Sequence, residues 1–341
     1  MTHTAVAVTT PPALTLLSLG AGVQSSALLL LAARGDLPRL DGAIFADTGW
    51  EPPQVYAHLM RLVREVAAPA GIPVYRVGRG NIRDDALNPD AARYASMPLY
   101  IRNPDGTEGM TRRQCTAEYK VAPIKRAVRQ LLGAPHPKPV PRGVWVEQWI
   151  GISTDEADRA LRRPDDVAYA HHRFPLLELG LSREQCKVFL ARTGFPSTPK
   201  SACIGCPYHV NAQWRQLRDE HPEQWADAVA FDAAIRSGGA RATAKGQMLN
   251  GQAYLHRSRV PLAQAPIDRV SYREWAQRQG DLLHELAVAE LEESLDAEQL
   301  GGCSPFGCHT GAASTDTYDA TDASDTDEAP VAGEYLTRIA A

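Results

Sequence analysis

Short runs rich in hydrophobic residues recur along the first half of the chain, and stretches with helical spacing separate them. A strand with one face in water alternates apolar and polar residues, so uninterrupted runs are typical of strands buried on both faces. The predicted strands lie at residues 13–19, 42–46, 72–77 and 144–152. Strands that alternate with helices in this way predict an α/β fold with a doubly wound, mostly parallel sheet.

The stretches between the strands carry signals for helix ends. Residues 25–34 form an apolar stretch that stops before Gly35, and glycine is preferred just after a helix. Pro52 suits the first turn of a second helix, and Pro123 opens or breaks a third helix that ends at Gly133. Capping-box spacings predict two more helix starts, at Ser153 with Glu156 and at Ser182 with Gln185.

The regions outside this pattern differ in character. Residues 78–115 are long and polar for a connection, and the turn at Asp105 and Gly106 predicts a hairpin that faces the substrate. An acidic helix is expected at 281–298. From about residue 200 the sequence is helical and irregular, and we expect its core to contain Trp214, Trp225 and Trp275.

These patterns divide the chain into four parts. They are a flexible N-terminus at 1–13, an α/β domain at 14–200, a helical, cysteine-bearing region at 201–309 and a disordered acidic tail at 310–341. The tail is low in complexity and rich in Asp, Ser and Thr, and such a composition buries too little apolar surface to fold.

The net charge of −4 is unevenly spread. Residues 281–309 carry seven acidic and no basic residues, and residues 310–341 carry seven acidic residues against Arg338 alone. The remaining part, 1–280, therefore carries +9. A basic body suits anionic partners such as nucleotides or nucleic acid, and an ordinary solvated surface is the alternative explanation.

The sequence shows no sign of a membrane or secretory segment. No apolar stretch is long enough to span a bilayer, and the N-terminus lacks the basic and apolar regions of a signal peptide. We therefore expect a cytoplasmic protein. In that compartment six cysteines favour metal or sulfur chemistry over disulfides.

A turn that contains glycine and serine follows the first predicted strand and leads into the first helix. In a parallel sheet such a turn presents backbone N–H groups and a helix N-terminus to an anion. The turn lacks the lysine of a Walker A loop, and a purely structural turn has the same composition. The residues that would surround a phosphate are Ser18, Gly20, Gly22, Gln24, Ser25 and Ser26.

Five segments of the chain resemble the motifs of one family, in the family's order. The first is SLGAGVQSS, which resembles an S-G-G-x-D-S pyrophosphate loop. The others resemble a D-T-G segment (FADTGWEPPQVYAHL), a C-C-x-x-x-K-x-x-P-L/I segment (QCTAEYKVAPIKR), a G-x-R-x-x-E-x-x-x-R segment (GISTDEADRA) and a G-C-x-x-C segment (SACIGCP). Together they cover roughly residues 14–210 and resemble the phosphoadenylyl-sulfate reductase-like family of the adenine-nucleotide α-hydrolase (PP-loop) superfamily.

The chain departs from the family pattern at four positions. Gln24 stands where the family loop has Asp, and Ala21 replaces one of its glycines. Ser153 replaces an Arg, and Gln114 takes the first place of the Cys-Cys pair. These departures affect the handling of Mg²⁺ or pyrophosphate and the sulfate contacts of a reductase.

The resemblance implies that residues 14–200 form a PP-loop domain that binds ATP or a (phospho)adenylyl sulfate together with Mg²⁺. It places the α-phosphate over the turn and makes Ser25 a candidate catalytic residue. Lys120 and Arg159 would neutralise phosphate charge.

The resemblance also assigns a ligand-binding role to the end of the second strand. Asp47, with Thr48 and Gly49, would contact the ribose or adenine or hold Mg²⁺ through water, and Asp47 is a second candidate catalytic residue. An N-cap for the following helix is the alternative for Asp47.

The cysteines offer a metal site. Two of them form a C-x₂-C pair, a turn that presents two thiolates to one metal. Four thiolates fit a 4Fe–4S cluster or Zn²⁺, His209 offers a Cys₂His alternative, and cysteines without a metal are the third interpretation. The candidate ligands are Cys115, Cys203, Cys206, Cys303 and Cys308.

Two cysteines have other possible roles. Cys308 precedes His309, a faint echo of the nucleophilic cysteine that reductases of this family carry near the C-terminus. The neighbouring histidine would favour its thiolate. Cys186 lies among apolar residues of a predicted helix, so we expect it in the core.

Three functions are compatible with these features. The first is a PP-loop enzyme that cleaves ATP to AMP and pyrophosphate and activates a substrate for sulfur transfer, with DNA or tRNA as a possible acceptor and a protein as a possible sulfur donor. The second is an adenylyl-sulfate or phosphoadenylyl-sulfate reductase that releases sulfite. The third is a nucleotide-binding partner protein without activity.

Overall fold

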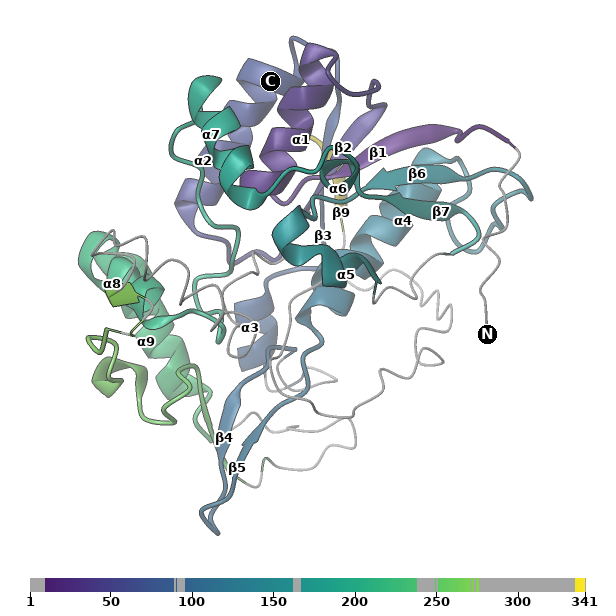
Figure 1. Ribbon diagram of the computed structural model, residues 1–341. Helices are drawn as coiled ribbons and strands as arrows, with labels where there is room; N and C mark the ends of the chain where they lie inside the picture. Colours follow the sequence, from purple (N-terminus) through teal and green to yellow (C-terminus); the bar gives the residue numbers. More distant parts are fainter. Residues whose placement is uncertain are drawn as a thin grey trace.

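A six-stranded sheet forms the centre of the molecule (Figure 1). The computed structural model describes residues 10–88, 90, 96–161, 167–237, 249, 251–270, 272, 274–275 and 335–340. The strand order is β7-β6-β1-β2-β3-β9, and every pairing is parallel except that of β9 with β3. The strands are β1 (Leu14–Ser18), β2 (Gly42–Asp47), β3 (Val74–Gly78), β6 (Val146–Trp149), β7 (Ala170–Arg173) and β9 (Tyr335–Arg338). The predicted α/β class and mostly parallel sheet are confirmed.

The strand order determines where along the edge of the sheet a ligand can bind. The chain runs from β1 through β2 to β3 on one side of β1, and then returns to place β6 and β7 on the other side. The connections after β1 and β6 therefore leave the sheet in opposite directions at its carboxyl edge. In open parallel sheets, this switch point is where ligands bind.

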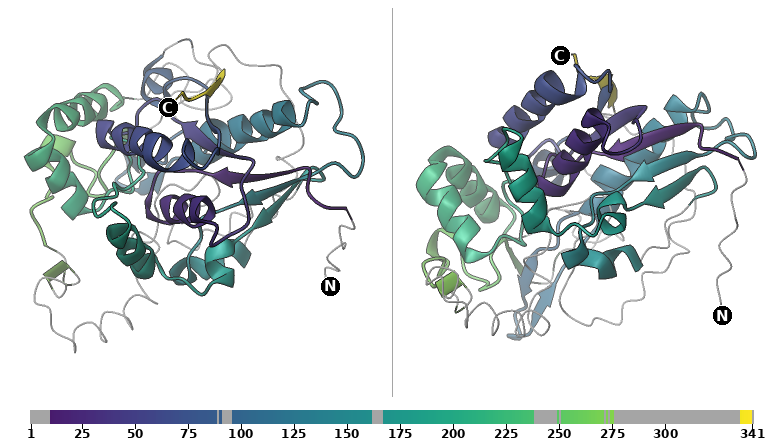
Figure 2. Two further views of the ribbon diagram at one scale, coloured as in Figure 1. Left: turned by 90° about the horizontal axis from the view of Figure 1, so that it is seen from above. Right: turned by 45° about the horizontal axis from the view of Figure 1, so that its top comes forward.

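Helices cover both faces of the sheet, as Figure 2 shows for α1 and α4. On one face, Leu17 and Phe45 belong to the cluster built with α1, α2 and α7, and on the other, Leu16 and Ile44 pack with α4. Strand neighbours such as Leu16 and Leu17 thus point to opposite faces, which explains the unbroken apolar runs. The helices are α1 (Val23–Arg34), α2 (Pro53–Leu62), α4 (Ala122–Leu131), α5 (Ala157–Leu161), α6 (Pro175–Glu178) and α7 (Arg183–Arg192).

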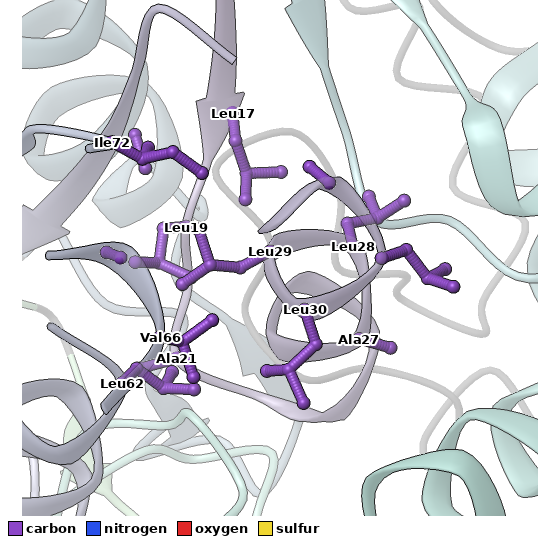
Figure 3. Close-up of a cluster of buried hydrophobic side chains, with 14 of the residues drawn as sticks. Leu17, Leu19, Ala21, Ala27, Leu28, Leu29, Leu30, Leu62, Val66 and Ile72 are labelled. Atoms are coloured by element: carbon purple, nitrogen blue, oxygen red, sulfur yellow. The ribbon is translucent and has the colours of Figure 1, made fainter. Parts of the chain in front are cut away.

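The helix that follows the first turn is held by close packing. In Figure 3, Leu28, Leu29 and Leu30 of α1 lie near Leu17 of β1 and Leu19 of the turn. Gly35 ends α1 in the left-handed conformation at φ 81°, as predicted. The strand before the turn at residues 19–22 and the helix after it are thus both packed into the same buried cluster.

Two helices are extended by π-helical turns. α2 and α4 are each joined to a π-helical turn, at Val63–Ala67 and Ala117–Val121. Pro123 therefore lies in the second position of α4 and does not break the helical segment. The helical segment therefore runs from Ala117 to Leu131, with Pro123 next to the junction of its π-helical and α-helical parts.

Only one of the two predicted capping boxes forms. Ser182 and Gln185 exchange both hydrogen bonds at the start of α7. The hydroxyl of Ser153 instead donates to Asp155, and a 3₁₀ turn at Thr154–Glu156 precedes α5. The prediction of a box at Ser153 is wrong because the Glu156 carboxylate is engaged elsewhere, as described below.

A second layer packs beside the carboxyl edge of the sheet. The predicted hairpin is confirmed, and a third strand joins it in the order β5-β4-β8. Trp214 is buried and Trp225 packs against the same cluster, whereas Trp275 is 44% exposed, so its assignment to the core is wrong. The elements are α3 (Ile82–Leu87), β4 (Tyr100–Arg102), β5 (Glu108–Met110), α8 (Asn211–Glu220), α9 (Pro222–Ala234) and β8 (Gln252–Tyr254).

Strand β9 corrects the expectation of a disordered tail for residues 335–338. These residues pair with β3 in antiparallel register, and Ile339 N donates to Val74 O at 2.8 Å. Leu336 packs with the cluster on the α4 face and Ile339 with the cluster on the opposite face, which supplies apolar contacts for this strand. The acidic helix predicted at 281–298 and tail residues 310–334 and 341 lie outside the described residues.

Gly78 of β3 provides a test of this strand. The Tyr335 ring lies over it, so that a Cβ at residue 78 would be 2.7 Å from the ring. We expect Gly78→Ala to lower the free energy of unfolding by about 1–3 kcal/mol, because the methyl group displaces Tyr335. Urea denaturation measures this loss. Gly109→Ala is the matched control, since its Cβ would have ordinary contacts at 3.9 Å, and equal stability of the two variants would refute the docking of Tyr335.

Candidate functional site

An open pocket of about 490 Å³ lies at the switch point between β1 and β6. Its walls come from the turn after β1, the first turn of α1, the connection after β6, and segments near α5, α7 and residue 200. The lining residues are Ser18, Gly20, Gly22, Val23, Gln24, Ser25, Ile150, Gly151, Glu156, Arg159, Arg183, Lys200 and Ser201. The structure thus brings six of the predicted nucleotide-binding residues, Ser18, Gly20, Gly22, Gln24, Ser25 and Arg159, to one site.

The turn after β1 is shaped by its small residues. Ala21 has φ 54°, in the left-handed region that favours glycine, and it is fully buried. Gly22 is the N-cap of α1. Gly151 lies so close to the turn that a Cβ there would be 3.0 Å from Ser25 N. The absence of a side chain at residue 151 therefore lets the connection after β6 approach the first turn of α1 closely.

Three cations and one carboxylate face this pocket. They are Arg159, Arg183, Lys200 and Glu156. Glu156 is buried, and it forms an ion pair with Arg159 one helical turn away. Burial raises the pKa of Glu156, while the two nearby arginines act in the opposite direction. The pocket therefore has a surplus of positive charge, which suits a polyanion.

Gln24 connects the turn to this carboxylate. Its amide Nε2 lies 3.4 Å from Glu156 Oε1 and 3.5 Å from Ser153 Oγ. A carboxylate at residue 24 would face Glu156 with like charge. The neutral amide of Gln24 avoids this repulsion. The one acidic side chain of the pocket lining is Glu156, on the wall opposite the turn.

The two serines of the turn have different roles. Ser25 lines the pocket, and its hydroxyl donates to Gly22 O at 3.3 Å. Ser26 is fully buried, and its Oγ lies 3.0 Å from His58 Nε2. The structure does not bring Ser26 to the pocket lining, because its hydroxyl is bonded to a histidine of α2, and its contact with a phosphate stays a prediction. Burial lowers the pKa of His58 to about 4, so this histidine is neutral at pH 7.

Asp47 is bonded within the protein and does not line the pocket. Its Oδ1 accepts from Gly49 N at 2.8 Å and from the Tyr56 hydroxyl at 2.7 Å. Its Oδ2 accepts from Arg76 and from the Tyr335 hydroxyl at 3.0 Å. Burial and the negative charge of Asp47 raise the pKa of Tyr335 to about 12, which keeps this donor protonated. The structure bonds the Asp47 carboxylate to four donor groups of the protein and does not bring it to the pocket lining, so its catalytic or nucleotide-binding role stays a prediction.

Thr48, Gly49 and Lys120 are also placed away from the pocket. Lys120 Nζ lies 3.4 Å from Glu51 Oε1 in a buried ion pair. Thr48 Oγ1 lies 3.1 Å from Cys203 Sγ and donates to Glu51 Oε1 at 3.3 Å. Gly49 turns the chain at φ 74°. The contacts of Thr48 and Lys120 link the end of β2 to the second layer, and the predicted nucleotide-binding roles of all three residues stay predictions.

The described cysteines do not assemble a metal centre by themselves. Cys203 belongs to one hydrophobic cluster, and Cys115 and Cys206 pack against that same cluster. In the part of the chain that the structure describes, no three His, Cys, Asp or Glu side chains gather as a group able to hold a metal ion. Cys303 and Cys308 lie outside the described residues, so the metal site and the nucleophilic role of Cys308 stay predictions.

His209 and Cys186 have clear structural places. His209 Nε2 lies 3.0 Å from Cys203 O, and its Nδ1 lies 3.3 Å from Gln213 Oε1, so its ring is bonded away from the thiols. The Cys₂His alternative is therefore not supported. Cys186 is buried in the cluster between α7 and α1, as predicted, and burial raises the pKa of its thiol to about 12.

Several pocket residues were not predicted from the sequence. Arg183, Lys200 and Ser201 line the pocket, and Gln148 Nε2 donates to Ser18 Oγ at 2.9 Å. Isolated cations in polar segments carry no motif. The one available signal is position: Gln148 lies in the predicted fourth strand, and Lys200 directly precedes the segment with the C-x₂-C pair.

Comparisons with known proteins add no further identification. The chain matches no family model, and no match was found among curated proteins or among solved structures. Among the helices of the described ranges, none has the length and apolar composition that a bilayer crossing requires.

Proposed function

We propose that the protein is a PP-loop-type enzyme that binds Mg·ATP at the pocket between β1 and β6 and cleaves it to AMP and pyrophosphate. The cleavage activates an acceptor for sulfur transfer. The observation that carries this proposal is the convergence of the turn after β1, the α1 N-terminus and three cations on one pocket. The resemblance of five segments to the PP-loop family supplies the class of reaction.

The geometry suits phosphate groups in two ways. The N-terminus of α1 carries the positive end of the helix dipole and N–H groups without helical partners. The α1 helix has no acidic residue in its first turn, so no side chain of that turn competes with an anion there. On the opposite wall, Arg183 and Lys200 add positive charge to the pocket.

The proposed reaction has two steps. An oxygen of the acceptor attacks the α-phosphorus, the bond from that phosphorus to the bridging oxygen breaks, and pyrophosphate leaves with that oxygen. A sulfur nucleophile then attacks the activated carbon of the acceptor, and AMP leaves with the acceptor oxygen. Arg183 and Lys200 would neutralise the charge that grows on pyrophosphate, and Ser25 would donate to the α-phosphate.

The described residues do not fit a resident metal. Glu156 is the one carboxylate in the lining, and Arg159 and Gln24 already bond it. Magnesium therefore enters with ATP as part of the substrate, and we route no step through an iron–sulfur cluster or zinc. DNA, tRNA and a sulfur-donor protein remain the candidate partners, motivated by the charge of +9 on residues 1–280.

The test uses full-length protein purified without oxygen, Mg²⁺ and α-labelled ATP. Formation of AMP and pyrophosphate supports the proposal. Adenylyl sulfate and phosphoadenylyl sulfate are assayed in parallel, and release of sulfite from either would make the protein a reductase. Nucleotide binding without any product would make it a binding protein. Either of these two results contradicts the proposed function.

We expect Lys200→Ala to weaken ATP binding about tenfold, because it removes a charged hydrogen-bond donor from the pocket. Isothermal titration calorimetry measures the change. Lys187→Ala is the matched control: Lys187 is an exposed lysine of α7 that pairs with Glu184. Equal affinity of the two variants would show that Lys200 does not contact the nucleotide.

A further inference from the structure

The C-x₂-C segment forms a closed turn. Cys206 N donates to Cys203 O at 3.1 Å, and residues 204–205 are the centre of the turn. A four-residue turn closed by this bond holds its end Cα atoms within about 7 Å of each other. Two cysteines can be bridged only when their Cα atoms lie within about this distance. The backbone therefore meets the Cα distance condition for a disulfide between Cys203 and Cys206.

Trp50, which follows the end of β2, holds this turn against the sheet. Ile204 N donates to Trp50 O at 2.9 Å, and Gly205 lies directly against the Trp50 ring, where no side chain fits. Trp50 in turn donates from Nε1 to Asp227 at 2.6 Å. The turn is thus held in place before any bond between the sulfurs forms, which lowers the entropic cost of closing it.

The two thiols differ in their surroundings. Cys203 is buried, with its Sγ 3.1 Å from Thr48 Oγ1 and 4.0 Å from Glu51 Oε1. Cys206 is half-buried. In a dithiol pair, the more exposed thiol reacts first with an incoming disulfide, and the buried thiol then resolves the mixed disulfide.

We propose that Cys203 and Cys206 are a redox-active dithiol that closes to a disulfide by exchange with a small disulfide such as oxidised glutathione. The thiolate of Cys206 attacks one sulfur of the oxidised glutathione, whose S–S bond breaks and releases one glutathione. The thiolate of Cys203 then attacks the Cys206 sulfur and releases the second glutathione. The protein loses two protons and two electrons, which together are two hydrogen atoms, and the glutathione disulfide gains them. This proposal is independent of the proposed function.

The sequence allows a direct measurement. Trypsin cleaves after Lys200 and Arg215, so one peptide, 201–215, contains Cys203 and Cys206 and no other cysteine. Full-length protein is equilibrated without oxygen in buffers of graded reduced and oxidised glutathione, quenched with acid, unfolded, alkylated and digested. We expect peptide 201–215 to change from a doubly alkylated form to an unalkylated form lighter by two hydrogen atoms. The peptide with Cys186 is the internal control and stays alkylated.

Two variants test the order of attack. In Cys203→Ser the remaining Cys206 is expected to accumulate as a mixed disulfide with one glutathione. In Cys206→Ser the buried Cys203 is expected to remain a thiol under the same conditions. Circular dichroism of both variants verifies that they fold, and the wild-type titration stands by itself if either does not.

Three results would overturn the proposal. The first is alkylation of both cysteines at every glutathione ratio. The second is a disulfide that joins either of them to Cys115, Cys303 or Cys308. The third is stoichiometric iron or zinc in the purified wild-type protein that both serine variants lose, because the thiolates would then be metal ligands.

Discussion

Replacing Gln24 with Glu is expected to weaken ATP binding about a hundredfold. The new carboxylate is isosteric with the amide, so it lies beside Glu156 Oε1, which is 3.4 Å from the Gln24 amide, and it faces the phosphates. At an effective dielectric constant of about 20, the new carboxylate and a phosphate charge about 6 Å away repel each other by about 3 kcal/mol. This free energy corresponds to a loss of about a hundredfold in ATP affinity. Calorimetric titration with Mg·ATP measures it, on the premise of the proposed function.

Gln24→Met is the control for this substitution, because it removes the hydrogen bonds of the amide without adding charge. We expect the Met variant to lose only a few-fold in affinity. The difference between the two variants should shrink as the pH falls, since burial already raises the pKa of Glu156 and a second carboxylate raises it further. Tighter binding or faster turnover in Gln24→Asp would contradict this account and favour a chain that lost activity with its loop aspartate.

The stability of the protein is expected to fall steeply in mild acid. Burial lowers the pKa of His58 and of His256 to about 4, compared with 6.5 in an unfolded chain. Between these pH values the unfolded state binds a proton at each site and the native state does not. The free energy of unfolding therefore decreases as the pH falls from about 6.5 to about 4, by about 1.4 kcal/mol per pH unit for each histidine, and this contribution is constant below pH 4.

Urea denaturation at a series of pH values between 7 and 4.5 measures this slope. We expect His58→Gln to reduce the slope by the contribution of one histidine, although the variant is less stable because it loses the contact with Ser26. His136→Gln, at an exposed position, is the control and should leave the slope unchanged. An unchanged slope in His58→Gln would show that His58 titrates normally in the native state.

The strands were predictable because strands buried on both faces have consecutive apolar residues. Leu16 and Leu17 pack on opposite faces, so an unbroken apolar run and a strand covered on both sides are the same observation. Gly35 was predictable for a similar reason, since the left-handed end of a helix favours glycine. The turn after β1 was found through its small residues, which the close approach of Gly151 explains.

The role of Asp47 was not predictable from its own segment. A carboxylate after a parallel strand has the same sequence pattern whether it faces a ligand or the protein. The deciding partners are Arg76 on the next strand and Tyr335, far along the chain. Arg183 and Lys200 were missed for the converse reason, because only the strand order brings them to the β1 and β6 edge.

The pairing of β3 with β9 has a consequence for the order of folding. Val77 pairs with Leu336, so the ribosome must synthesise the chain through residue 336 before this edge of the sheet can close. Until then the outer N–H and C=O groups of β3 are an open template for strands of other chains. A chain cleaved before residue 335 keeps that edge permanently open. Strand β9 thus protects the exposed edge of β3 from pairing with strands of other chains.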